Sequence, residues 1–220
     1  MSSEKEPLFS SKNLKLITTP LGTTNPITVQ VLGICSALAV TAKLEPSIVM
    51  SISVVFVMVF ANLFISLLRK TIPSRIRIIV QLTIVASLVI LVDQILKAYA
   101  YDVSKQLSVF VGLIITNCII MGRLEAFALG NKPWPAVLDG FGNAAGYGII
   151  LVIVGFVREL FGTGNLTLPG FGEIQIVPNI FYEWGYVDNG LMILPPMALI
   201  TVGIIIWIQR SKNKELIDAS

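Results

Sequence analysis

Long stretches without any charged residue are the feature that most constrains the fold of this 220-residue chain. A helix that crosses a bilayer needs roughly 20 consecutive apolar residues, with a lower limit of about 17. A run at residues 78–100 is interrupted only by Asp93 and Lys97 near its end. Five further runs are free of charge: residues 26–42, 46–68, 106–122, 140–157 and 190–209. We therefore expect an all-α integral membrane protein with six transmembrane helices.

The composition supports this fold class and excludes several functions. Charged residues make up 13% of the chain, against about 25% in soluble domains. Histidine is absent, which excludes histidine-ligated haem, histidine-rich metal sites and histidine general bases. Residues 1–24 are charged and rich in turn-forming residues, so they do not have the apolar core of a cleavable signal peptide.

The distribution of Lys and Arg predicts the orientation in the membrane. With six crossings, the connecting segments alternate between the two sides. Twelve basic residues fall on one side: Lys5, Lys12, Lys15, Arg69, Lys70, Arg75, Arg77, Arg123, Lys132, Arg210, Lys212 and Lys214. Four fall on the other: Lys43, Lys97, Lys105 and Arg158. The positive-inside rule then places both termini in the cytoplasm. Basic residues in short loops are an orientation signal, so no nucleic-acid partner is expected.

Two stretches resemble each other, and each contains one cysteine. Residues 35–45 and 118–125 both run from a cysteine to a basic residue followed by Leu-Glu. The next spans end similarly, in Arg69 and Arg158. Repeats of three crossings each must enter the membrane from opposite faces, because three is odd. We expect a cytoplasmic N-terminal arm (1–24), two inverted three-helix repeats (25–105 and 106–210), an outer loop within the second repeat (161–189, an ordered interfacial cap) and a cytoplasmic tail (211–220).

The first segment of each repeat is short and interrupted, at Gly33 and at Thr116-Asn117. Such segments at matching places in two halves point to a site near the membrane midplane, and here they contain Cys35 and Cys118. A cysteine in a membrane helix is usually a small packing residue. Thiolates also select iron–sulfur, zinc or copper centres, and two thiolates fill half of a four-cysteine site. Both interpretations remain open from the residues alone, and the metal interpretation requires ligands from a second subunit.

Other polar and small residues allow further predictions. Asp93 and Lys97 are spaced for an ion pair on one helix face, although an acid within a span is also a candidate for an ion path. The glycine-rich stretch 140–148 resembles a dinucleotide-binding fingerprint, but it opens a transmembrane run without a preceding strand. Close helix packing explains it better. We expect inter-helix hydrogen bonds from Asn62, Gln81, Asn117 and Asn143, and Asn117 could alternatively donate to a cluster sulfur.

Several motifs resemble a known family. They are Asn25-Pro26, residues 30–41, 93–99 and 104–113, Thr116-Asn117-Cys118 and Gly122-Arg123. The family comprises the D-type membrane protein of the bacterial sodium-translocating NADH:quinone oxidoreductase and the E-type membrane protein of the Rnf electron-transport complex. The likeness extends from about residue 25 to about residue 209, and residues 104–113 resemble the quinone reductase more.

The resemblance implies a role in a respiratory translocase of the bacterial inner membrane. A homologous E-type protein of opposite topology would be the partner within a six-subunit complex surrounded by membrane lipid. Cys35 and Cys118 would hold an iron centre (a single iron or a [2Fe-2S] cluster) together with two cysteines of that partner. The centre would relay electrons from NADH, through flavins on other subunits, to ubiquinone, coupled to sodium export. No autonomous activity is expected. A secondary transporter with inverted repeats and a purely structural subunit are the alternatives.

Overall fold

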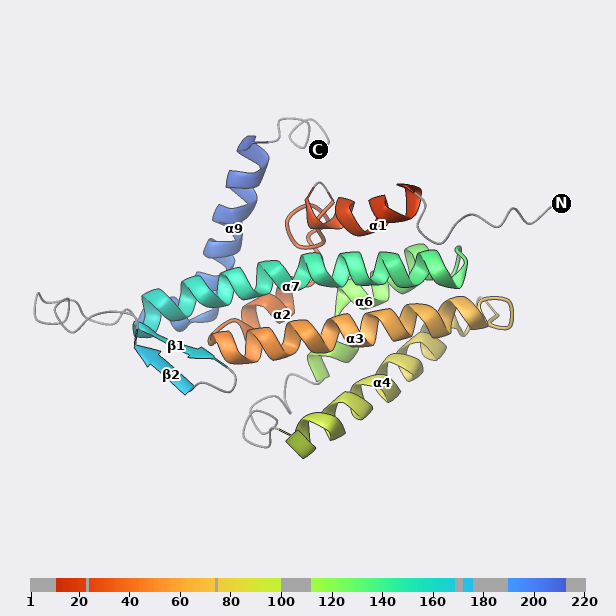
Figure 1. Cartoon of the computed structure of the whole chain (residues 1–220), viewed down its shortest axis with the longest axis horizontal. Coiled ribbons are helices and arrows are strands. Elements are labelled where there is room, and N and C mark those ends of the chain that lie inside the picture. Colours follow the sequence, from red (N-terminus) through yellow and green to blue (C-terminus); the bar gives the residue numbers. More distant parts are fainter. Residues whose placement is uncertain are drawn as a thin grey trace, which may run out of the picture.

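The computed structural model describes residues 11–22, 24–73, 75–99, 112–168, 172–175 and 190–212. These residues are mostly helical (Figure 1). The helices are α1 (Ser11–Leu21), α2 (Ile34–Val40), α3 (Leu44–Leu68), α4 (Arg77–Tyr99), α6 (Cys118–Arg123), α7 (Pro133–Thr163) and α9 (Pro195–Lys212). Shorter elements are the π-helical turn η1 (Leu124–Ala128), the 3-10 turn η2 (Gly190–Ile193) and the strands β1 (Asn165–Leu168) and β2 (Gly172–Gln175).

The long helices α3 and α7 lie side by side at the centre of the molecule (Figure 1). Gly140, Gly148 and Gly155 of α7 face α3 so closely that an added Cβ would come within 2.5–3.0 Å of its side chains. The neighbours of these glycines run backwards along α3, from Asn62 to Ser47, so the two helices are antiparallel. The prediction that the small residues of the glycine-rich stretch 140–148 serve close helix packing is confirmed.

Helix α1 covers another face of α7. A Cβ added at Gly142 or Gly146 would lie 2.6 Å from the carbonyl oxygen of Leu16 or Pro20. The helix backbone of α1 therefore rests directly on α7. Within the expected arm 1–24, residues 11–21 therefore form a helix that packs on α7.

Three of the described helices are long and apolar enough to cross a membrane: Leu44–Leu68, Arg77–Ala98 and Pro133–Thr163. The expected span 26–42 does not form one helix, because α2 covers only residues 34–40 of it. Val31 (φ 58°) and Gly33 (φ 79°) adopt left-handed conformations that a right-handed helix cannot contain. The expected run 106–122 is broken at Asn117, as predicted, by an extended backbone (ψ 121°). Residues 106–111 lie outside the described residues.

The boundaries around α7 also differ from the prediction. We expected a loop over 123–139, but the chain is helical through Ala128 and again from Pro133. Proline is favourable in the first turn of a helix, where its missing N–H is not needed. At its other end α7 continues to Thr163, and an antiparallel hairpin follows, with Asn165 opposite Gln175. The protein is therefore not entirely α-helical. The rest of the expected cap, including residues 176–189, lies outside the described residues.

Candidate functional site

Tyr147 lies midway along the 31 residues of α7, and its side chain is completely buried. A helix of this length extends over about 46 Å, more than the roughly 30 Å of a hydrocarbon core. The middle of α7 is therefore the part that would lie deepest in a membrane. An isolated hydroxyl is costly at that depth unless it is hydrogen-bonded.

The first turns of the two short helices meet at Tyr147. The Ser36 hydroxyl oxygen of α2 lies 2.6 Å from the Tyr147 hydroxyl oxygen. Asn117, the N-cap residue of α6, donates from Nδ2 to Ser36 Oγ (3.3 Å) and to the Tyr147 oxygen (3.4 Å). Ser36 is 2% exposed and Asn117 4% exposed. We call Ser36, Asn117 and Tyr147 the buried triad.

From the buried triad, α2 and α6 run in opposite directions along α7. Thr41, just after α2, accepts a hydrogen bond from Arg158, eleven residues beyond Tyr147. Arg123, the last residue of α6, pairs with Asp139, eight residues before Tyr147. The two short helices therefore start at one point and diverge towards opposite ends of α7.

Each cysteine is the sequence neighbour of a triad residue. Cys35 precedes Ser36, and Cys118 follows Asn117. Both cysteines are free, and both are exposed on this chain although the triad beneath them is buried. The structure thus brings the neighbours of the two predicted ligands into contact and leaves both thiols accessible to another protein.

The donor set fits half of a thiolate-bound metal centre. Among the described residues, no group of three or more His, Cys, Asp or Glu side chains gathers where one ion could bind. Two thiols supply two of the four ligands of a four-cysteine centre, and completion of the site by a second subunit stays a prediction. Cys35 and Cys118 are the residues that could hold iron here.

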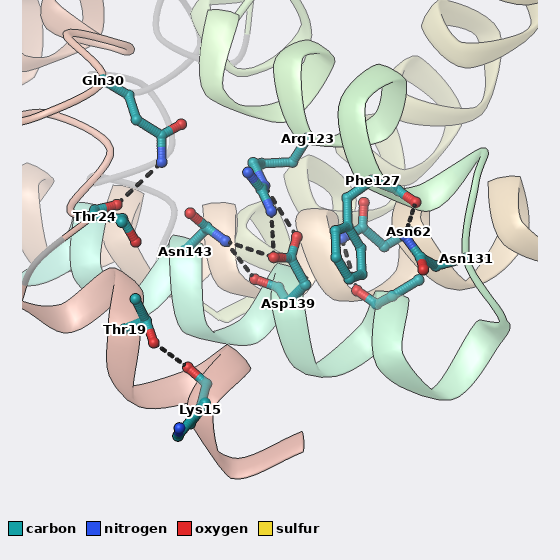
Figure 2. Close-up of polar contacts among 11 residues, drawn as sticks. Lys15, Thr19, Thr24, Gln30, Asn62, Arg123, Phe127, Asn131, Asp139 and Asn143 are labelled. Carbon is teal, nitrogen blue, oxygen red and sulfur yellow. Dashed lines mark hydrogen bonds and ion pairs between the residues drawn. The ribbon is translucent and has the colours of Figure 1, made fainter. Parts of the chain in front are cut away.

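A second polar cluster was missed from the sequence. Asp139 accepts a 3.0 Å hydrogen bond from Nε of Arg123 and one of 3.1 Å from Asn143 (Figure 2). The expected loop placement of Asp139 hid this role, although its i,i+4 spacing to Asn143 was a usable signal. Asn143 also donates to the backbone of Asp139, within its own helix. Its predicted inter-helix hydrogen bond is therefore wrong among the described contacts. The cluster borders a cavity of about 340 Å³ that Lys15, Thr19, Gln30 and Phe127 also line.

Arg158 and Glu159 form a third buried polar site, close to the end of α7. We expected Arg158 in a loop, but its side chain is fully buried and donates to the carbonyl oxygens of Met192 (3.1 Å) and Leu194 (3.2 Å). Glu159 accepts a 2.8 Å hydrogen bond from the backbone N–H of Leu44. A charge at the end of an apolar run can equally lie in a loop or be buried, so the sequence did not distinguish these cases.

The remaining predicted polar residues lie as follows. Lys97 Nζ lies 2.6 Å from Asp93 Oδ2, so the expected contact is present. Asn62 donates to the carbonyl oxygen of Ala136 (2.9 Å), which links α3 to α7. Gln81 donates to Glu125 (3.1 Å), which links α4 to η1. With Asn117, three of the four predicted inter-helix hydrogen bonds are confirmed.

Known proteins resemble this chain over nearly its whole length. A family model described as "Rnf-Nqr subunit, membrane protein" matches residues 13–206. Among similar proteins, the D-type subunit of the Na(+)-translocating NADH-quinone reductase from Shewanella sp. strain W3-18-1 is 56% identical over 213 residues, which cover 96% of this chain and 99% of the relative. Its counterparts from Shewanella sp. strain ANA-3 and Shewanella halifaxensis strain HAW-EB4 are 57% and 56% identical over 213 residues, with the same coverage of each chain. The resemblance inferred from the motifs is therefore confirmed.

Proposed function

Because this chain belongs to the Rnf-Nqr family of membrane subunits, we propose that it serves as the D-type subunit of a sodium-translocating NADH–quinone reductase. Relatives that share more than half of its residues over nearly its whole length carry that name. The chain thus acts as one subunit of an enzyme complex in a bacterial inner membrane. It relays electrons through an intramembrane iron centre, and the complex couples this relay to sodium export.

In this proposal, Cys35 and Cys118 hold the iron, and a homologous E-type protein of opposite topology supplies two more thiolates. The contact between Ser36 and Asn117 at Tyr147 carries the proposal, because it joins the immediate neighbours of both cysteines. A single packing cysteine needs no such arrangement. When bound, an iron centre of this kind takes up and passes on one electron at a time.

The surroundings of the cysteines also suit a metal centre shared with a second protein. The buried triad holds the backbone next to each sulfur, while the exposed thiols remain available to a partner protein.

Reciprocal contacts support the inverted repeat. Near the end of α3, Arg69 reaches the carbonyl oxygen of Gly130, in the turn after η1 (3.4 Å). Near the end of α7, Arg158 reaches the carbonyl oxygen of Leu38, in α2 (3.4 Å). Each long helix thus contacts the short-helix region of the other repeat, and the long helices are antiparallel. Both features are expected of halves related by a two-fold axis in the membrane plane.

Two other functions remain as outcomes of the test. A membrane protein of an Rnf-type complex would also contain iron, but the full-length similarity to reductase subunits favours the reductase. A secondary transporter would use the same architecture without iron. Iron in the purified complex therefore separates the transporter from the two electron-transfer functions.

The deciding experiment replaces Cys35 and Cys118 separately by Ala in the whole complex. We expect each variant to lose its iron by elemental analysis and to lose the associated paramagnetic resonance signal. NADH oxidation with an artificial acceptor should continue, because that step lies on another subunit. Ser53→Ala is the matched control, since within the described part of the chain the Ser53 hydroxyl bonds only to its own helix. If both cysteine variants keep full iron and full quinone reduction, the cysteines are packing residues.

A further inference from the structure

We propose that Tyr147 is a positioning residue for the iron centre, which it serves by fixing the first turns of α2 and α6 relative to each other. This inference rests on the proposed function, because the relative placement of Cys35 and Cys118 matters chemically only if they share a metal. Tyr147 is not itself a ligand of the metal in this proposal. It acts through Ser36 and Asn117.

The hydrogen bonds assign a direction to each proton of the triad. Ser36 Oγ donates to the carbonyl oxygen of Gly33 (2.9 Å). Its oxygen is then the acceptor for the Tyr147 hydroxyl, 2.6 Å away. Asn117 donates from Nδ2 to both hydroxyl oxygens and accepts from the backbone N–H of Ile119 through Oδ1 (3.3 Å). Tyr147 thus supplies a donor to α2 and an acceptor to α6 from a single atom.

The Tyr147 ring reinforces this arrangement sterically. A Cβ added at Gly33 would lie 2.8 Å from ring atom Cε2. The ring therefore packs directly against the backbone where α2 begins. The Tyr147 side chain is completely buried, so its hydroxyl does not contact bulk solvent. Hydrogen bonds in such a site hold their geometry more strongly than at a surface.

Tyr147→Phe tests the contribution of the hydroxyl apart from that of the ring, because it keeps the ring and removes only the hydroxyl oxygen. Outer-shell partners of metal ligands typically change metal affinity or activity by about 10- to 100-fold. Tyr147 contacts Ser36 and Asn117, the chain neighbours of the cysteines, and acts on the cysteines only through them. We therefore expect the low end of that range, about tenfold. The change should appear as faster loss of iron to a chelator.

The experiment compares the purified complex in wild-type form with the Tyr147→Phe, Ser36→Ala, Ser53→Ala and Cys35→Ala variants. Iron content, the paramagnetic resonance spectrum, the midpoint potential and the rate of iron loss to a chelator are measured for each. We expect Tyr147→Phe to retain iron initially, to show a changed spectrum and a shifted potential, and to release iron faster. Ser36→Ala should change the same quantities, and Ser53→Ala should match the wild type.

The variants distinguish this inference from the proposed function. If Cys35→Ala keeps its iron, the proposed function fails and the inference fails with it. If Cys35→Ala loses its iron while Tyr147→Phe matches Ser53→Ala in spectrum, potential and chelator resistance, only the positioning role of Tyr147 is overturned. If Tyr147→Phe does not assemble, Ser36→Ala decides by the same measurements, because it removes the acceptor of the same hydrogen bond.

Discussion

The guanidinium Nη1 of Arg158 lies 2.6 Å from the hydroxyl oxygen of Thr41, and both side chains are completely buried. Within the described part of the chain, no carboxylate forms an ion pair with Arg158. Its donors instead go to Thr41 and to the carbonyl oxygens of Leu38 and of Met192, Ile193 and Leu194. One side chain therefore ties the end of α2 and the segment before α9 to α7. With Tyr147 at its first turn, α2 is held by α7 at both ends.

Arg158→Met should destabilise the protein strongly. A buried acceptor left without a donor costs about 1–3 kcal/mol, and several acceptors would lose Arg158 at once. Arg158→Lys should recover only part of the stability, because an ammonium cannot reproduce the planar fork of donors. Thermal unfolding of the detergent-solubilised complex measures both effects. Arg69→Met is the control, since Arg69 donates one long, exposed hydrogen bond. Equal unfolding temperatures for Arg158→Met and Arg69→Met would contradict the stabilising role of Arg158, which joins α2 and the segment before α9 to α7.

The sequence predicted those elements that follow from local chemistry. Long apolar runs identified α3, α4 and the core of α7, although Asp93 and Lys97 interrupt the run of α4 near its end. A helix in lipid satisfies its backbone internally, so such runs are a strong signal. Polar breaks correctly marked where the cysteine-containing segments are interrupted. At Gly33, the absence of a Cβ permits both the left-handed backbone and the close approach of the Tyr147 ring.

What the sequence did not predict depends on contacts between distant segments. Arg158 and Arg69 end similar runs, yet one is buried among carbonyl oxygens and the other is not. Only the position of the segment before α9 decides this difference. The docking of α1 depends in the same way on Gly142 and Gly146, more than a hundred residues away along the chain. Tyr147 could not be recognised as the meeting point, because it belongs to neither cysteine segment.

The orientation of the chain can be tested by thiol labelling from outside the cell. The twelve-to-four distribution of basic residues predicts that both termini are cytoplasmic and that the 161–189 segment is external. A membrane-impermeant reagent should label a cysteine introduced at Asn165 and should not label one at Ser2. Permeabilised cells provide the control, because both positions should then react. Labelling of Ser2→Cys but not of Asn165→Cys in intact cells would reverse the orientation.

Asp93→Asn tests whether the acid of α4 has a structural or a sodium-conducting role. Lys97 is 47% exposed and Asp93 14% exposed in their side chains, and an exposed i,i+4 pair contributes only about 0.2–0.5 kcal/mol. If the pair is only structural, the complex should assemble normally, and sodium-dependent quinone reduction should stay within a few-fold of wild type. Lys97→Gln is the control, because it breaks the same pair and leaves the acid. Loss of sodium dependence in Asp93→Asn alone would place Asp93 on the ion path.

Gly33→Ala should disrupt the start of α2 without changing any hydrogen-bonding side chain. An alanine at φ 79° is strained, at a cost of about 1–3 kcal/mol. Its Cβ would also lie 2.8 Å from the Tyr147 ring, which is completely buried. We therefore expect a lower unfolding temperature of the complex together with reduced iron content, because Cys35 lies two residues further on.

Gly203→Ala provides the control for this substitution. Gly203 lies within α9, and nothing lies within 4 Å of a Cβ added there. Alanine in such a helix interior is more stable than glycine by roughly 0.5–1 kcal/mol, so this variant should unfold at or slightly above the wild-type temperature with unchanged iron. Should Gly33→Ala behave like Gly203→Ala in both measurements, the left-handed turn and the contact with Tyr147 would not determine where α2 begins.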